Sequence, residues 1–174
     1  PGPPQSTTIT VNPTAQVNDS PDLTVCHNQN IPATLFSTLN TGGSTSYTWT
    51  NDNTTVGLTV AGIGNLPAFT ALNTTTLPVT ATITVTPAFS NAAVTCPGPS
   101  QTFTITINPT AQADDPADQA LCNGDPVAAV NFTTANTGGT TSYTWTNSNP
   151  TVGLAAAGTG DIATFTAANS TFAP

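Results

Sequence analysis

The chain consists of two copies of one unit, joined end to end without a gap. When residues 6–78 are aligned with residues 102–174, a shift of 96 positions, 39 of the 73 pairs are identical. Cys26 falls on Cys122, and Trp49 falls on Trp145. Self-similarity at a fixed period is typical of arrays of small domains. Because an array needs repeats and a catalytic site rarely does, the repeat indicates an architectural role rather than an enzyme.

The net charge limits the kinds of partner that the chain can bind. The chain has no Lys or Arg, and its eight acidic residues give a formal net charge of −8. Without cations it cannot neutralise phosphates, so nucleic acid is excluded as a partner. Anionic membrane surfaces are excluded for the same reason. No apolar run approaches the roughly 18 residues of a membrane helix, so we expect no membrane insertion.

Composition also favours an extracellular or cell-surface location. Thr is abundant and β-branched, which favours strands, and the lack of Lys and Arg removes every trypsin site. The three cysteines show no C-x-x-C spacing, so a disulfide framework is favoured over a zinc site. The copy of Cys96 would be position 192, beyond Pro174, which accounts for the odd thiol of Cys122. A chain that begins with Pro1 is expected to be a processed or trimmed product.

The hydrophobic period is two wherever it is clear. Val79, Ala81, Ile83 and Val85 alternate with threonines, and residues 102–107 do the same. Such alternation predicts strands with one buried and one solvated face. One unit contains about seven such strands, near residues 24–26, 34–39, 46–50, 58–61, 68–72, 79–86 and 102–107.

These strands predict an all-β fold of tandem immunoglobulin-like β-sandwich repeats with a 96-residue period. We expect residues 13–108 to form a complete sandwich. Residues 109–174 should form a second sandwich that lacks its last two strands. Residues 1–12 match residues 97–108, so they should be the last strand of a preceding or neighbouring domain.

Several motifs keep their order and spacing in both copies: Thr-Val-Cys at residue 24, Ser-Tyr-Thr-Trp-Thr-Asn at 46, Phe-Thr-Ala-x-Asn at 69, and Thr-Phe-Thr-Ile-Thr-Ile-Asn-Pro at 102. This series resembles the PKD-like, immunoglobulin-fold repeats of Bacteroidota-type surface proteins. The resemblance implies a tandem spacer in a secreted or surface-anchored protein, of a kind capable of building extracellular fibrils. It also implies a Cys26–Cys96 disulfide and no catalytic residues. We expect no cofactor.

Two groups of residues invite a chemical role. His27 is the only imidazole, but its counterpart is Asn123 and the nearest acid in sequence is Asp22, so catalysis and metal binding are not favoured. A cluster of aspartates near the joint between the units could offer oxygen ligands to calcium, but no EF-hand pattern occurs and a solvated acidic turn is favoured. The cluster comprises Asp114, Asp115, Asp118 and Asp125.

Five sequons for N-glycosylation occur, at Asn18, Asn53, Asn73, Asn131 and Asn169. Their number is about what the composition gives by chance. Asn73 and Asn169 recur at the same register, so we expect glycans there first, if a glycoprotein is formed.

The aromatic and glycine motifs favour structure over binding. Trp49 shares a strand face with Tyr47, so core packing under Phe69 is preferred to a sugar-stacking platform, and Trp145 should pack likewise under Phe165. The Gly-x-Gly motifs at residues 62 and 158 lack a following helix. They are interpreted as turn glycines with positive φ rather than phosphate loops.

The sequence therefore predicts a structural subunit of an extracellular fibre or surface stalk, and no enzyme. The alternative is a carbohydrate-binding or adhesin module. We expect identical subunits to assemble head to tail, with residues 1–12 of one subunit completing the truncated domain of its neighbour. Thr8-Ile9-Thr10-Val11 matches both the expected sixth strand at residue 82 and the seventh at residue 104, which leaves two slots open.

Overall fold

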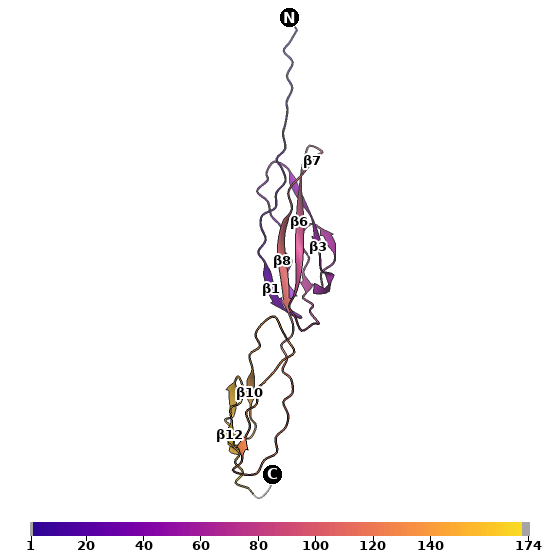
Figure 1. Ribbon diagram of the computed structural model, residues 1–174. Helices are drawn as coiled ribbons and strands as arrows, with labels where there is room; N and C mark the ends of the chain where they lie inside the picture. The colour runs from indigo at the N-terminus through magenta and orange to yellow at the C-terminus, as the bar shows by residue number, and fades with distance from the viewer. Residues whose placement is uncertain (1, 172–174) are drawn as a thin grey trace. The chain divides into compact units, whose positions relative to one another are not determined.

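The computed structural model describes residues 2–171 of the chain. Its contacts divide the chain into two compact units, unit 1 at Pro1–Pro109 and unit 2 at Thr110–Pro174. In the described part of both units, the regular secondary structure is β-strand apart from short 3-10 turns (Figure 1). In the described part of the chain, no helix is long and apolar enough to cross a bilayer. Because strands make up nearly all of the regular secondary structure, the expected all-β class is confirmed.

The main sheet of unit 1 has the strand order β1-β8-β6-β3-β4, with β7 also paired to β6. The bounds are Leu23–Cys26 (β1), Ser44–Asn51 (β3), Ala61–Ile63 (β4), Val79–Asn91 (β6), Val94–Pro97 (β7) and Gln101–Asn108 (β8). β1 runs parallel to β8, and the other neighbours are antiparallel. The long strand β6 is central, because β3 pairs along one edge while β7 and β8 pair along the other.

A smaller pairing faces the same core. β2 (Asn30–Ile31) pairs with β5 (Phe69–Thr70), and an isolated bridge joins Thr34 to Leu66. A 3-10 turn, η1 (Thr54–Val56), follows β3 and is capped by the side chain of Asn53. Ile31 and Leu66 are buried in one cluster with the inward side chains of the main sheet. This shared cluster joins the two sheets.

The threonine alternation decides which face is buried. Ile83 and Val85 of β6 and Ile105 and Ile107 of β8 are all at most 2% exposed, while the threonines between them are partly exposed. Burying such aliphatic side chains contributes roughly 1.5–3 kcal/mol each. The apolar half of each strand therefore supplies the core.

Trp49 is buried as expected, at 3% exposure, with Phe69 packed against the same cluster. Gly62 is required by this ring, since an added Cβ would lie 2.2 Å from Cζ2 of Trp49. Its φ is not in the left-handed region, whereas Gly64 has φ +78°. The turn-glycine interpretation thus holds for Gly64 and is replaced at Gly62 by close packing.

Three expected strands need correction. The strand expected near residues 58–61 lies instead at Ala61–Ile63. Residues 34–39 form no strand beyond the single bridge, because the N–H of Phe36 donates to Asn65 Oδ1 and Ser37 O accepts from the N–H of Asn18. The sixth strand continues to Asn91 and turns back into β7, with Ala92 and Ala93 at positive φ. The sequence gives no Gly or Asn-Gly signal for that hairpin.

Unit 2 repeats the shorter pairings of unit 1 at a shift of 96 residues. β9 (Pro126–Val127) pairs with β12 (Phe165–Thr166), and β10 (Thr144–Thr146) pairs with β11 (Ala157–Thr159). The bridge between Val130 and Ile162 and the 3-10 turn η2 (Pro150–Val152) also recur. Residues 119–122, the counterpart of β1, form no strand, since the described part of unit 2 contains no counterpart of β8.

Candidate strand-docking site

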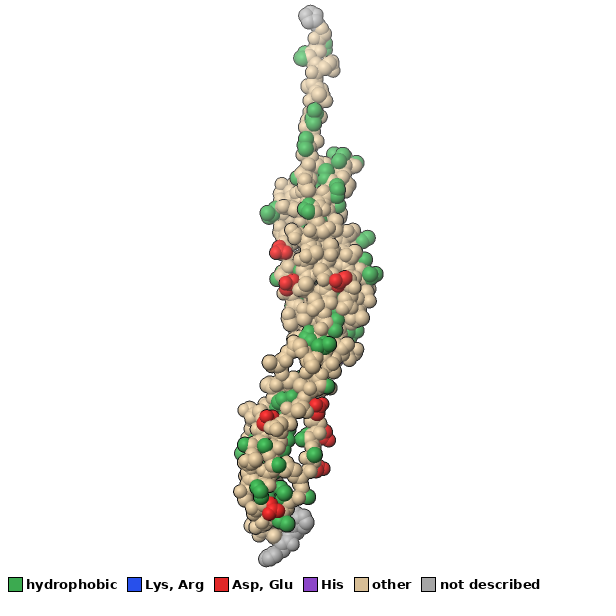
Figure 2. Space-filling view, in the orientation of Figure 1, with side chains coloured by type: hydrophobic (Ala, Val, Ile, Leu, Met, Phe, Trp, Pro, Cys, Tyr) green, Lys and Arg blue, Asp and Glu red, His purple; other side chains and the backbone are tan. Residues whose placement is uncertain are grey.

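The N-terminal arm, defined here as residues 2–12, carries a copy of β8 that is not paired. Gln5 to Asn12 reads QSTTITVN, against QTFTITIN for Gln101–Asn108. Residues 2–11 are exposed and form no strand. Ile9 and Val11 are 84% and 86% exposed, and apolar side chains are visible along the arm in Figure 2. The arm therefore presents the alternating side chains of a core strand to solvent.

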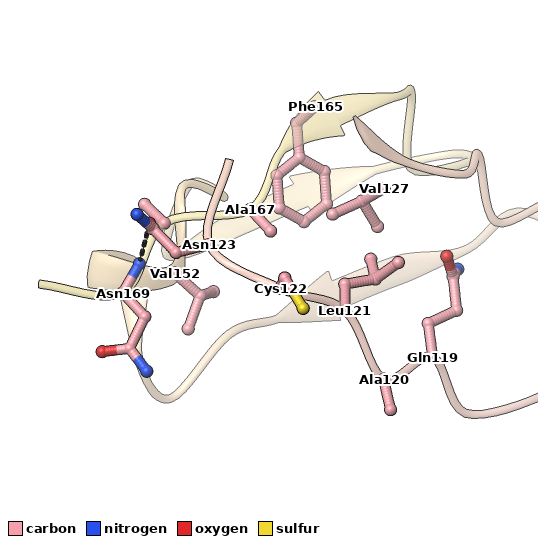
Figure 3. A pocket seen from close by; sticks show the side chains of 11 residues that line it. Gln119, Ala120, Leu121, Cys122, Asn123, Val127, Val152, Phe165, Ala167 and Asn169 are labelled. Atoms are coloured by element: carbon pink, nitrogen blue, oxygen red, sulfur yellow. Dashed lines mark hydrogen bonds between the residues drawn. The ribbon is translucent and has the colours of Figure 1, made fainter. Parts of the chain in front are cut away.

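Unit 2 contains an open groove of about 530 Å³. Leu121, Val127, Val152 and Phe165 form its apolar wall, with Cys122 beside Leu121 (Figure 3). The remaining lining residues are Gln119, Ala120, Asn123, Ala167, Ala168 and Asn169. The wall thus combines residues 119–123 with β9, η2 and β12.

The equivalent side chains of unit 1 are buried. Val25 is 7% exposed and Val56 is 0% exposed, whereas their counterparts Leu121 and Val152 are 46% and 36% exposed. In unit 1, β8 pairs with β1, and its Ile107 belongs to the same buried cluster as Val25 and Val56. The groove of unit 2 therefore corresponds to the space that core strands fill in unit 1.

Polar groups fix β8 in unit 1 at three points. Asp22 Oδ1 accepts from the N–H of Thr104 at 2.7 Å, which lowers the pKa of Asp22 from its ordinary value. The N–H of His27 donates to Asn108 O at 3.0 Å. Asn73 Nδ2 donates to Ile107 O at 2.7 Å.

Each of these three residues has a counterpart in unit 2. The counterparts are Asp118, Asn123 and Asn169. Asn123 and Asn169 line the groove directly (Figure 3). Unit 2 therefore retains the residue types that hold the backbone of β8 in unit 1.

The His27 side chain makes a structural hydrogen bond and does not form a catalytic or metal site. Its Nδ1 accepts from the N–H of Asn73 at 2.9 Å. In unit 2, Asn123 Oδ1 accepts from the N–H of Asn169 at 2.8 Å. A ring nitrogen and an amide oxygen thus serve the same loop, which explains why His and Asn exchange between the copies.

The aspartate cluster does not converge on an ion site. In the part of the chain that the structure describes, no three His, Cys, Asp or Glu side chains gather to hold a metal. Asp114 Oδ2 instead accepts from Thr133 Oγ1, and Asp125 Oδ2 accepts from the N–H of Cys122. The calcium candidates Asp114, Asp115 and Asp118 are therefore not assembled into a site.

The sequons differ in accessibility. Asn73 is 4% exposed and its Nδ2 donates to both Leu77 O and Ile107 O, so no amide hydrogen is left for a glycan. This corrects the expectation that Asn73 is a preferred site. Asn53 and Asn18 also use Nδ2, toward Thr80 O and Ser37 Oγ. Asn131 and Asn169 are exposed.

The expected Cys26–Cys96 disulfide is not formed, and all three cysteines are free thiols. Cys26 lies beside Asn108 at one end of β8, and Cys96 lies beside Phe89 near the β6–β7 hairpin. Ten residues of β6 separate Val79, which faces Ile107, from Phe89. At about 3.3 Å per residue the two thiols lie at opposite ends of the sheet, far beyond the reach of a disulfide.

No protein-family model matches this chain, and no curated protein matches it in sequence.

Proposed function

We propose that this protein is a structural subunit of an extracellular fibre or surface stalk, built of tandem immunoglobulin-like sandwiches related to PKD-like repeats. One observation carries the proposal. The open groove of unit 2 has the lining that β6 and β8 cover in unit 1, and the exposed arm matches β8 at five of its eight positions. In a head-to-tail assembly, the arm of one copy fills the groove of the next.

The arm matches the β8 slot in repeat register. Transferring the β1–β8 register by 96 residues pairs Ile9 with Gln119, Val11 with Leu121 and Asn12 with Cys122. In this register Ile9 and Val11 take the places of Ile105 and Ile107, which are buried in unit 1. Thr8 and Thr10 take the places of the partly exposed Thr104 and Thr106. Residues 119–122 then gain the parallel neighbour that makes β1 a strand.

Strand donation of this kind propagates. The arm and the groove are different surfaces of the same chain, so each copy offers an arm to one neighbour and a groove to another. Such a heterologous contact continues as a filament rather than closing into a dimer. Backbone ladder bonds supply affinity, and alternate side chains in the groove supply register.

The sandwich interpretation rests on the two pairings that share one core. β2–β5 and the main sheet bury their inward residues together, with Trp49 on β3, the third strand of the chain. An extracellular location is supported by a chain without Lys or Arg and with a formal charge of −8. Burial of Trp49 removes the sugar platform in unit 1 that would favour an adhesin.

Removal of residues 1–12 tests the proposal. We expect the full chain to form filaments under negative stain and the shortened chain to stay dispersed. A synthetic peptide of residues 1–12 should bind the shortened chain, while the same peptide with Ile9→Asp and Val11→Asp should not. Filaments from the shortened chain, or equal binding of both peptides, would show that the arm does not fill the groove.

A further inference from the structure

The end of β8 in unit 1 defines what surrounds an arriving arm in unit 2. Cys26 is the strand partner of Asn108, and the N–H of His27 donates to Asn108 O. Cys122 is the counterpart of Cys26, is exposed, and lines the groove (Figure 3). An arm in the β8 slot therefore places its Asn12 directly beside Cys122.

Asn12 is also fixed to its own unit. Its Nδ2 donates to Asn91 O at 3.3 Å, and Asn91 Nδ2 donates to Asn12 Oδ1 at 2.9 Å. Asn91 faces Val94 across the β6–β7 hairpin, and Cys96 follows two residues later in β7. The base of the arm is thus tied to the hairpin that carries Cys96.

The chain that follows the arm runs along β7. A Cβ added at Gly98 would lie 1.9 Å from Ala15 O, so Gly98 and Ala15 are in close contact. Asn12 lies at the hairpin end of β7 and Ala15 at its other end, and Cys96 stands between these two levels. Cys96 is half-buried here, with a free thiol. It lies about two residues, or roughly 7 Å along the strand, from the level of Asn12.

We propose that Cys122 of one copy and Cys96 of the copy that donates the arm form a disulfide across this junction. The inference rests on the proposed strand exchange in the β8 slot. Asn12 then has the acceptor's Cys122 as strand partner and its own Cys96 hairpin as hydrogen-bonded neighbour. Partner Cα atoms on adjacent strands are about 5 Å apart, which places Cys122 of the acceptor directly beside Asn12. Cys96 of the donor lies about two residues further along β7, on the side toward which the chain continues to Ala15.

This pairing distinguishes Cys122 from Cys26, although their strand positions are equivalent. The slot beside Cys26 is already filled by Asn108 of the same chain. An arriving arm therefore meets Cys122 and not Cys26. The junction would use one thiol from each of two copies, and Cys26 would stay reduced.

The bond forms by thiol–disulfide exchange. Two thiols lose two protons and two electrons and become one disulfide, and an external disulfide oxidant accepts them and leaves as two thiols. Oxidised glutathione is the oxidant in the test. The product is a covalent chain of subunits within the filament, which detergent alone cannot separate.

Serine variants of the three cysteines test this on the full chain. After assembly with oxidised glutathione, the wild type and Cys26→Ser should give a ladder of multimers on a non-reducing denaturing gel. Cys96→Ser and Cys122→Ser should give only monomers on that gel, although both still form filaments under negative stain. Their filaments also show that they are folded.

Cleavage before Asp identifies the bond. It should link the fragment 118–124 to the fragment 52–113. Filaments without a ladder in the wild type, a ladder that persists in Cys122→Ser, or one lost in Cys26→Ser would overturn the disulfide alone. Failure of the wild type to form filaments would overturn both the strand exchange and the disulfide that depends on it.

Discussion

Units 1 and 2 place the same residues in the same local pairings, yet they bury them to different extents. Trp49 lies opposite Gly62 and Trp145 opposite Gly158, and each glycine is in close contact with the ring. Trp49 is buried, whereas Trp145 is only half-buried, contrary to the expectation that both are core residues. A short hairpin can therefore form by itself, but its apolar side chains are buried only where long strands cover them.

The difference lies in β6 and β8. In unit 1 these strands bury Ile83 and Ile107 in the same cluster as Trp49. In the described part of unit 2 no such strands cover Val152, which is 36% exposed against 0% for Val56. Local pairings therefore persist without the long strands, but burial does not.

The largest effect should come from removing the buried tryptophan. Trp49→Ala is expected to destabilise unit 1 by about 3–5 kcal/mol, the usual range for a core aromatic. Trp145→Ala should cost the free subunit clearly less, because its ring is already partly exposed. Urea unfolding followed by circular dichroism measures both. Equal losses would mean that the two units are equally well packed.

The next prediction compares an isoleucine of β8 with its counterpart in the N-terminal arm. Ile105→Ala should destabilise unit 1 by about 2–5 kcal/mol because Ile105 is 1% exposed. Ile9→Ala should leave the stability of the free subunit unchanged, since Ile9 is 84% exposed.

Ile9→Ala should instead weaken assembly. The loss of about 1.5–3 kcal/mol of burial in the groove corresponds to a critical concentration roughly 10- to 100-fold higher. Sedimentation of filaments over a concentration series measures it, with Thr10→Ser as the matched control. An unchanged critical concentration would argue against burial of Ile9 in the assembled state.

A buried amide gives a smaller effect. Asn73→Ala removes the two Nδ2 hydrogen bonds, to Leu77 O and Ile107 O, and should cost about 1–3 kcal/mol. Asn169→Ala should cost the free subunit less, because Asn169 is exposed. Thermal unfolding compares the pair. A larger loss for Asn169→Ala would contradict the assignment of Asn73 as the anchor of a core strand.

The smallest effect concerns pH. The hydrogen bonds from Thr104 lower the pKa of Asp22, so the folded state binds this proton less readily than the unfolded state does. Asp22 therefore stabilises unit 1 at pH values above its ordinary pKa of 3.8, and this stabilisation is lost as the pH falls through the lowered value. In Asp22→Asn, the free energy of unfolding should therefore fall less steeply as the pH is lowered than it does in the wild type.

Asp19→Asn provides the control, since it removes the same charge at a neighbouring exposed position. Acid titration followed by circular dichroism distinguishes the two variants. An unchanged acid limb in Asp22→Asn would mean that its bond to Thr104 does not persist in solution.

Much of the fold was predictable from alternation and repetition. The threonine pattern located β6 and β8 and their buried faces, and the repeat located the equivalent pairings of unit 2. The region around Phe36 was not predictable, because its backbone bonds go to Asn65 and to the segment near Asn18, which are distant in sequence. The β6–β7 hairpin was missed because its turn uses Ala92 and Ala93 rather than Gly or Asn.

The groove of unit 2 and the positions of the cysteines show most clearly what could not be predicted from the sequence. The sequence aligned Leu121 with Val25 and Val152 with Val56, but the lining of the groove and the exposure of Leu121 are tertiary facts. Sequence resemblance favoured a Cys26–Cys96 bond within one domain. The register of β1, β6, β7 and β8 instead places the two thiols at opposite ends.

The sequence by itself determined the all-β class, the 96-residue period, the buried and solvated faces of the long strands, and the absence of any Lys or Arg. These properties depend on residue type and spacing, which need no knowledge of distant neighbours. Tertiary structure alone decided that Trp49 is buried and Trp145 is not, that Asn73 holds a core strand, and that Cys26 and Cys96 are apart. Each of these depends on which strands lie side by side, because burial and disulfide reach are set by neighbours in space.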